Sequence, residues 1–314
     1  MARFVGVKLY TLILQVWVVS TLVFMLIHLM PGDPAALALG TERGADAQAL
    51  AEMRKTLGLD QPLLQQYISW ISSFVQLDMG NSLFDQTAVS TFIAQRLPNT
   101  IELAVVSIIL AVIIGVPLGI AAALKRQSFL DLLLSSTAAL GISFPVYVLG
   151  AFLIILFSFQ LQLLPAGGFT PFSEDPAKHI QRLALPAITL ALGLAASIAR
   201  MTRSSMLETL GKDYVQTHRA KGLSEWSVVF KHAFRNAIIP VVTIIGLQLG
   251  NLIGGTVLVE YLFNWPGMST LLVNSIGNRD YPLIQGCIVV MATFFIVVNM
   301  LVDILYGLMD PRVR

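Results

Sequence analysis

The chain has 314 residues, of which 56% are hydrophobic and only 12% charged, with a net charge of +2 and a mean hydropathy of +0.76. A soluble domain carries about twice that charged fraction, so the composition excludes an ordinary soluble protein. The apolar residues gather into runs near the roughly 20 residues that a helix needs to cross a bilayer. Backbone groups in the bilayer core must pair internally, and runs this long favour helices over a closed barrel. The sequence therefore predicts an all-α integral membrane protein.

Six such runs follow one another along the chain, and each is interpreted as a transmembrane helix. They cover residues 9–30, 100–124, 132–160, 184–201, 237–262 and 283–307. Lys and Arg are concentrated at both ends of the chain and in the connections after the second and fourth runs. Because the Lys- and Arg-rich side of a membrane protein is cytoplasmic, both termini are predicted to face the cytoplasm.

The first run is interpreted as an uncleaved span rather than a secretion signal. It is longer than the apolar core of a signal peptide, and residues 31–34 separate it from the cleavage-like tripeptide at 36–38. The polar segment 31–96 then contains two amphipathic stretches, at 46–56 and 64–77. Their apolar faces predict a small folded extracytoplasmic cap on the membrane surface between the first two spans.

These elements predict a division of the chain into four parts. They are an N-terminal tip with the first span at 1–30, the cap at 31–96, a five-span domain at 97–307 and a cytoplasmic tail at 308–314. The five-span domain includes a basic cytoplasmic loop, residues 204–236.

Small residues recur inside the spans at helix-packing spacing. In the fifth run Gly246, Gly250 and Gly254 lie on one helical face, which favours ordinary close packing of helices. The alternative is that this face meets a second subunit or lines a path of changing width. Glycine and proline at 115–119 and 141–145 predict loosened or kinked helices there.

The basic loop contains a predicted amphipathic helix at 224–235. Ser224 is placed to cap its N-terminus, and Glu225 lies where the helix dipole favours an anion. Apolar residues at helical spacing form one stripe, made of Trp226, Val229, Phe230 and Ala233. We expect such a helix to bind a cytoplasmic partner, and the alternative is a surface helix that stabilises the cytoplasmic face.

The sequence lacks the motifs that mark common catalytic sites. It has no Gly-x-x-x-x-Gly-Lys-Ser/Thr phosphate loop, no His-Glu-x-x-His pair and no Gly-x-Ser-x-Gly turn. Its 4 histidines are scattered, and its single cysteine, Cys287, is expected to be a packing residue because one cysteine forms neither an internal disulfide nor a thiolate cluster. We therefore expect no enzyme active site and no cofactor or metal in this chain.

Ionisable residues are rare within the runs, and those present lie near span ends. Gln248 and Asn251 in the fifth run either face a translocation path or bond to neighbouring helices. The candidates for a path or an outer gate are Gln248, Asn251, Glu260, Trp265 and Asp280. The spans lack the charged relay expected of a proton- or ion-driven carrier, so the energy for any transport is expected to come from another subunit.

The basic loop resembles the cytoplasmic coupling loop of ABC importer permeases, and more narrowly that of the dipeptide, oligopeptide and nickel permease family. The similar residues are Arg219-Ala220-Lys221-Gly222-Leu223-Ser224 and those from Lys231 to Pro240. The family pattern recurs at 31–34, 57–63, 199–206, 259–267, 279–282 and 310–312. The general motif begins Glu-Ala-Ala, whereas this chain has Thr217-His218-Arg219 near that place.

The resemblance implies a type I ABC importer permease fold in a bacterial cytoplasmic (inner) membrane. The implied partners are a second homologous permease, two ATP-binding subunits that hold ATP and Mg, and an extracytoplasmic solute-binding protein, with no nucleic acid. The implied coupling residues toward the ATPase are Arg219, Ala220, Lys221, Gly222, Ser224, Glu225, Trp226, Val229, Phe230, His232 and Asn236.

The implied solute is a short peptide, a dipeptide or an oligopeptide, delivered by the binding protein. Nickel chelates and glutathione are alternatives within the same family, because nothing in the spans selects among them. A stand-alone secondary carrier or channel, and a membrane scaffold, are the competing classes of function.

Overall fold

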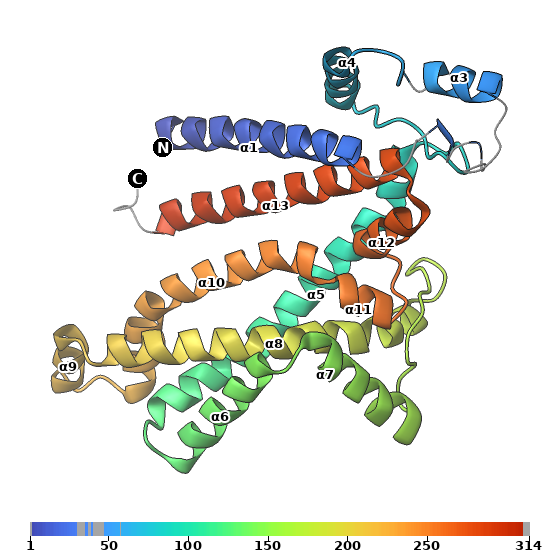
Figure 1. The fold of residues 1–314 in the computed structure, drawn as a ribbon. Coiled ribbons are helices and arrows are strands. Elements are labelled where there is room, and N and C mark those ends of the chain that lie inside the picture. The colour runs from blue at the N-terminus through green and yellow to red at the C-terminus, as the bar shows by residue number, and fades with distance from the viewer. Residues whose placement is uncertain (1, 30–34, 37–38, 40–46, 57, 310–314) are drawn as a thin grey trace. The chain divides into compact units, whose positions relative to one another are not determined.

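The computed structural model describes residues 2–29, 35–36, 39, 47–56 and 58–309, and these residues are almost entirely helical (Figure 1). The helices are α1 (Ala2–Leu29), α3 (Ala47–Thr56), α4 (Leu63–Val75), α5 (Val89–Leu124), α6 (Phe129–Ser143), α7 (Val146–Leu153), η1 (Ile154–Gln160), α8 (Pro176–Leu210), α9 (Asp213–Ala220), η2 (Ser227–Ala233), α10 (Phe234–Gly255), α11 (Val257–Leu262), α12 (Met268–Asn278) and α13 (Tyr281–Met309). The predicted all-α class is confirmed. The predicted cap segments 46–56 and 64–77 correspond to α3 and α4.

Five stretches of helix within the described residues are long and apolar enough to cross a membrane. They are Gly6–Leu26, Val89–Leu124, Pro176–Leu210, Ser227–Gly250 and Tyr281–Ile304. The remaining predicted span, 132–160, is interrupted: α6 ends at Ser143, and the backbone of Pro145 is extended rather than helical, with φ −58° and ψ 133°. The apolar segment continues as Val146–Gln160, so the break predicted at 141–145 is confirmed.

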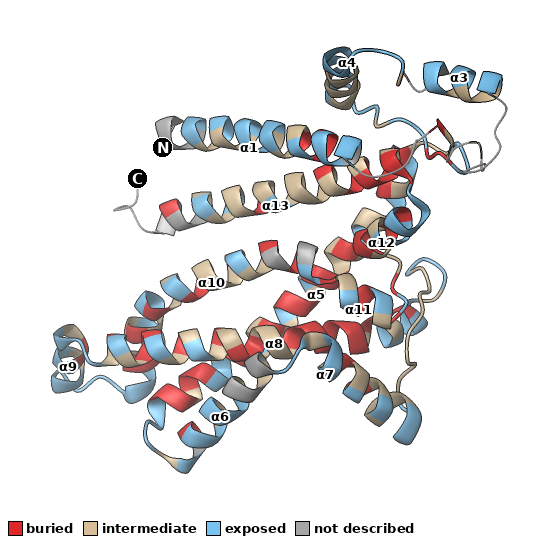
Figure 2. Cartoon of the chain, in the orientation of Figure 1, coloured by how far each residue is buried: buried red, intermediate tan, exposed pale blue. Residues whose placement is uncertain are grey.

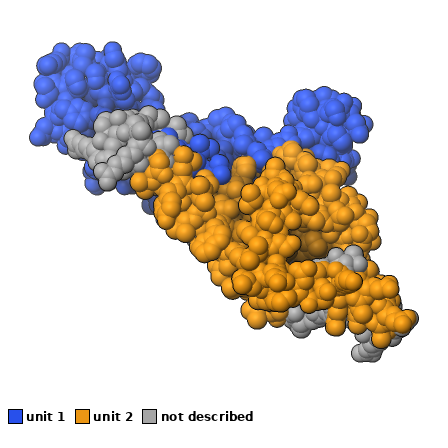
Figure 3. All heavy atoms as spheres, turned by 90° about the horizontal axis from the view of Figure 1, so that it is seen from above, with its two compact units in different colours: residues 1–5, 101–265, 297–314 blue, residues 6–100, 266–296 orange. Residues whose placement is uncertain are grey.

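The described chain forms two compact units, which Figure 3 colours separately. Unit 1 comprises residues 1–5, 101–265 and 297–314, and unit 2 comprises residues 6–100 and 266–296. Neither unit is a continuous segment of the chain. The four-part linear division made from the sequence stays a prediction.

Helix α8 is the central element of unit 1, and buried residues lie along it (Figure 2). It packs against α6, α7 and α10. Asp175 caps its N-terminus, because the Lys178 backbone N–H donates to Asp175 Oδ1 at 3.0 Å. Pro176 follows at the first helical position, where its missing N–H costs no hydrogen bond.

The glycines of α5 allow this helix to approach α8 closely. A Cβ on Gly115 would lie 2.7 Å from the Ala195 carbonyl oxygen, and one on Gly119 would lie 2.6 Å from the Ala199 carbonyl oxygen. Helix α5 continues through Pro117 to Leu124. The sequence interpreted these glycines as loosening the helix, whereas the structure uses them for helix packing.

The glycine face of α10 also packs within the chain at one position. A Cβ on Gly246 would lie 2.3 Å from Cγ1 of Val302 in α13. This contact supports the ordinary packing alternative for Gly246. Gly250 is buried, and the surroundings of Gly254 lie outside the described part of the chain.

Unit 2 joins α1 to α4 and the first half of α13 to α12. The hydroxyls of Thr21 and Tyr67 share a hydrogen bond of 2.7 Å, and the rings of Phe24 and Trp70 lie 5.7 Å apart between centroids. A separate apolar cluster includes the fully buried Cys287. That environment agrees with the packing role expected for the cysteine.

Candidate functional site

The predicted coupling loop folds as two helices joined by a tight turn in unit 1. Helix α9 follows α8 closely and has Asp213 in its first turn and Arg219 in its last, which suits the helix dipole at both ends. Gly222 then adopts a φ of +76°, a left-handed conformation that L side chains rarely take. The turn at Gly222 leads directly into the helix that begins at Glu225.

The second helix of the loop is continuous with the fifth predicted span. Its start is capped as expected, because the Ser227 backbone N–H donates to Ser224 Oγ at 3.4 Å. From there helical structure runs through η2 and α10 to Gly255. The sequence predicted a separate short helix at 224–235, and this is corrected: the segment forms the first turns of a much longer helix.

The predicted apolar stripe is divided between the protein interior and the surface. Val229 and Ala233 are 3% and 0% exposed, and they pack in a cluster with Ile120 of α5. Trp226 and Phe230 are 71% and 41% exposed, with ring centroids 5.4 Å apart. Of the four stripe residues, only these two aromatic residues are available to a partner.

Polar contacts fix α9 to the helix that follows it. The Arg219 guanidinium donates to both carboxylate oxygens of Glu225, at 2.8 and 3.2 Å, across the turn. Asn236 Nδ2 donates to the Tyr214 hydroxyl at 2.9 Å. The structure thus brings the predicted residues Arg219, Glu225 and Asn236 together with Tyr214 as a brace between the two helices.

The histidines of the loop form a second contact between the same helices. The rings of His218 and His232 are stacked with centroids 4.0 Å apart. Tyr214 and His218 were missed as site residues by the sequence interpretation. The charge pattern of α9, acidic first and basic last, was the signal that this segment is a helix in its own right.

We define the coupling surface as the exposed residues between positions 220 and 231. They are Ala220, Lys221, Gly222, Leu223, Ser224, Glu225, Trp226, Phe230 and Lys231. An exposed aromatic pair flanked by lysines combines an apolar anchor with positive charge, which is the chemistry of a protein-binding surface.

Two of the predicted path residues lie in the core of unit 1. Glu260 is fully buried and accepts a hydrogen bond from Thr256 Oγ1 at 3.1 Å. The Trp265 backbone N–H donates to the Glu260 carbonyl oxygen at 2.8 Å. The Trp265 ring is also fully buried, at a centroid distance of 5.0 Å from Phe169. These contacts give both residues a structural role in this conformation.

The other predicted path residues have separate surroundings. Gln248 Nε2 donates to Ser197 Oγ of α8 at 3.4 Å, which supports the helix-bonding alternative. The side chain of Asn251 lies outside the described part of the chain. In unit 2, Asp280 is 3% exposed and accepts a 2.5 Å hydrogen bond from Ser82 Oγ. Asp280 thereby ties residue 82 to the start of α13.

A buried histidine near the start of α8 was not singled out by the sequence interpretation. His179 is 2% exposed, and its Nε2 lies 2.8 Å from Glu102 Oε1 while its Nδ1 lies 2.8 Å from the Thr170 carbonyl oxygen. The Glu102 carboxylate thereby joins α5 to α8.

Metal-binding chemistry is not supported by the part of the chain that the structure describes. Across those residues, no group of three or more His, Cys, Asp or Glu side chains is arranged to hold a metal ion.

Comparison with protein families gives two matches that together cover most of the chain. The family described as the binding-protein-dependent transport system inner membrane component matches residues 115–314. The N-terminal family of binding-protein-dependent transport system membrane components matches residues 1–104.

Individual relatives match over the whole length. The glutathione transport system permease protein GsiC of Shigella flexneri serotype 5b is 46% identical over 314 residues, which is 100% of this chain and 99% of the relative. GsiC of Escherichia coli strain K12 is 45% identical with the same coverage.

Solved structures show the same fold. A chain of the inward-facing MetNI methionine ABC transporter has a TM-score of 0.59 and 17% identity, over 70% of this chain and 97% of that chain. A second crystal form of that transporter gives a TM-score of 0.58 and 18% identity, over 70% of this chain and 96% of the other. At these identities the likeness concerns the fold alone. The family matches and the full-length relatives carry the assignment: the chain belongs to the binding-protein-dependent transport system inner membrane component family and is a multi-pass permease subunit of an ABC importer.

Proposed function

We propose that this permease imports glutathione or a closely related short peptide. The proposal is supported by the 46% identity over the whole chain to a permease named for glutathione transport. Glutathione is a tripeptide, and the sequence analysis expected it as an alternative to the dipeptide or oligopeptide solute. The solute would arrive from an extracytoplasmic binding protein and cross between this chain and a second, homologous permease.

The proposed energy source is a pair of cytoplasmic ATPases that bind ATP and Mg, with no catalytic group in this chain. The observation that carries this proposal is the exposed Trp226–Phe230 pair on the braced two-helix loop. Aromatic residues that anchor in a pocket of a partner dominate the binding energy of many interfaces. We therefore propose that the coupling surface binds the ATPase. This requires the surface to face the cytoplasm, the side on which the Lys and Arg distribution also places both termini.

The connections of the coupling surface explain how movement would reach the membrane. Helix α9 follows α8 after the short turn at Gly211 and Lys212, and the helix from Glu225 continues without a break into α10. The Arg219–Glu225 ion pair holds the two together. A displacement imposed on the coupling surface would thus move α8 and α10 as a unit, which is a rigid-element route between two sites.

Truncation of the aromatic pair tests the proposed ATPase contact. In the double variant Trp226→Ala, Phe230→Ala, we expect ATPase recovered with the tagged permease to fall at least about tenfold, because loss of an interface anchor commonly costs about 2 kcal/mol or more. The matched control is Phe84→Ala, which removes an exposed aromatic residue of unit 2. Undiminished ATPase recovery in the double variant would refute the contact.

A further inference from the structure

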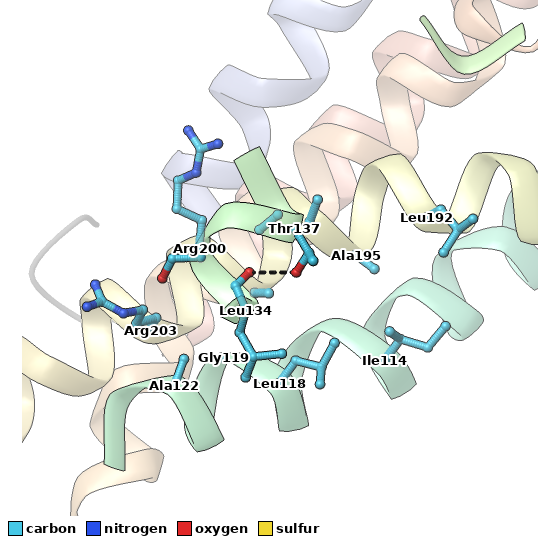
Figure 4. A pocket seen from close by; sticks show the side chains of 14 residues that line it. Ile114, Leu118, Gly119, Ala122, Leu134, Thr137, Leu192, Ala195, Arg200 and Arg203 are labelled. Carbon is cyan, nitrogen blue, oxygen red and sulfur yellow. Dashed lines mark hydrogen bonds between the residues drawn. The ribbon is translucent and has the colours of Figure 1, made fainter. Parts of the chain in front are cut away.

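A pocket of about 460 Å³ lies between α5, α6 and α8 in unit 1 (Figure 4). It falls in the size range of small-ligand sites, roughly 300–1,000 Å³. The pocket has two chemically different ends. Ile114 and Leu192 lie at one end, and Arg200 and Arg203 lie at the other.

The wall between the two ends is apolar and built from small side chains. Ala122, Ala195, Ala196 and Ala199 contribute little volume, and this leaves room along α5 and α8. The hydroxyls on the α6 side are already engaged. Thr137 Oγ1 donates to the Leu133 carbonyl oxygen at 3.0 Å, so the hydrogen of this hydroxyl already has an acceptor within the protein and needs none from a ligand.

The charged end keeps a net positive charge. Arg203 is neutralised by Asp131, to which its Nε and Nη2 donate at 2.6 and 2.8 Å. Arg200 is exposed, and within the described ranges no carboxylate forms an ion pair with it. Lys125 and Arg126 are also exposed. They lie next to this end of the pocket, since the following residue, Gln127, donates its backbone N–H to Asp131 Oδ2 at 3.0 Å.

We propose that this pocket binds one anionic phospholipid of the cytoplasmic leaflet. The acyl chain lies against the small residues of α5 and α8, and the phosphate accepts hydrogen bonds from Arg200, whose planar guanidinium matches phosphate geometry. Basic pockets between transmembrane helices on the cytoplasmic side have the charge to hold such headgroups. The inference uses the cytoplasmic placement of this end, which belongs to the proposed function.

The chemistry of the wall separates a lipid from the transported solute. A short peptide carries charge at both ends, and one end would face the apolar wall without a partner, which is costly. A phospholipid places its charge at the arginine end and hydrocarbon along the rest. The occupant with matching chemistry is therefore an anionic amphiphile.

The experiment measures lipid bound to the intact transport complex, purified through a tag on this chain and stripped with mild detergent. Native mass spectrometry is recorded after addition of phosphatidylglycerol or phosphatidylcholine. The wild type should retain phosphatidylglycerol with a preference of roughly fivefold, the effect of about one cation near an anionic surface. Arg200→Gln should remove the preference, and Ala138→Phe should prevent retention of either lipid by filling the pocket.

Two control variants keep the result specific to the pocket. Lys212→Gln removes an exposed cation outside the pocket, one that pairs with Glu208 at 3.2 Å, and should leave the preference unchanged. Ser136→Phe adds the same bulk on α6 at an exposed position that is not part of the pocket lining, and should leave retention unchanged.

Each alternative occupant gives a distinct result. Equal retention of both lipids by the wild type would overturn the anionic site. Displacement of phosphatidylglycerol by millimolar glutathione would assign the pocket to the solute path, and a cross-link from Arg200→Cys to the second permease would assign it to that interface. The experiment measures retained lipid and does not depend on transport. It therefore remains valid even if the protein does not import glutathione.

Discussion

The backbone at Gly222 sets how α9 meets the helix that begins at Glu225. Its φ of +76° is left-handed, and an added Cβ would meet no atom within 4 Å. The constraint on this position is therefore the backbone conformation itself and not side-chain space. The Arg219–Glu225 ion pair closes over the turn and depends on it.

Substitution of Gly222 tests this constraint. Gly222→Val should strain the turn by about 1–3 kcal/mol and lower both ATPase recovery and ATP-dependent uptake. Gly222→Asn is the matched control, because asparagine tolerates the left-handed region far better than a β-branched residue. Equal activity of the two variants would show that the turn geometry does not matter for coupling.

Asp131 is a residue whose charge should affect the stability of the protein in acid. The Arg203 guanidinium and then the Gln127 backbone N–H hold the pKa of its carboxyl well below the usual value. A carboxyl with a depressed pKa in the folded state stabilises the protein fully above its unfolded pKa, near 4, and loses this contribution as the pH falls through the folded pKa.

The prediction concerns the melting temperature of the detergent-solubilised protein. Asp131→Asn should lower it by several degrees between pH 5 and pH 8, and the difference from wild type should shrink as the pH falls below about 4. Asp60→Asn, at an exposed position, should have little effect at any of these pH values. A difference that persists undiminished at pH 3 would contradict the role of the ionised carboxylate.

At the scale of elements, close helix packing depends on glycines in α5 and α10. Gly246 is the most restricted, since a Cβ there would lie 2.3 Å from Val302. Gly246→Leu should lower the unfolding free energy by about 1–3 kcal/mol through overpacking. In the same helix Gly255 has nothing within 4 Å, and Gly255→Ala should be tolerated. The melting temperatures of the two variants check this prediction. An equal effect of the two substitutions would show that the contact with Val302 does not restrict position 246.

The sequence predicts the elements better than it predicts which faces they bury. The break before Pro145 and both cap helices follow from local patterns. The buried face of the stripe at 226–233 does not follow from a local pattern. The reason is that η2 is a π-helix, in which the Phe234 N–H bonds to the Val229 carbonyl oxygen five residues back. A stripe counted at 3.6 residues per turn loses register there, and α5 covers part of it.

The buried polar residues show the same limit. The sequence places Glu260 and Asp280 near span ends, where polar residues commonly meet water. Glu260 bonds to Thr256, four residues before it in the chain. Asp280 bonds to Ser82, which is 198 residues away in the sequence. No local sequence pattern could have predicted the second contact, because it exists only in the tertiary structure.

At the scale of the whole molecule, the proposed topology makes opposite predictions for two lysines. Lys55 lies in the cap helix α3 and Lys221 on the coupling surface, and both are exposed. After replacement of the single cysteine, Cys287→Ala, an impermeant thiol reagent should label Lys55→Cys in intact cells. Lys221→Cys should be labelled only in inverted vesicles. Reversed accessibility would overturn the orientation, and with it the assignment of the coupling surface to the cytoplasm.

The central claim is that this permease moves its solute with energy supplied by ATPases at the coupling surface. The most direct measurement is uptake of radiolabelled glutathione by proteoliposomes that contain the purified complex and its binding protein. Uptake should require hydrolysable ATP on the ATPase side and should be lost in the Trp226→Ala, Phe230→Ala variant. Equal uptake without ATP, or by this chain reconstituted alone, would contradict the account.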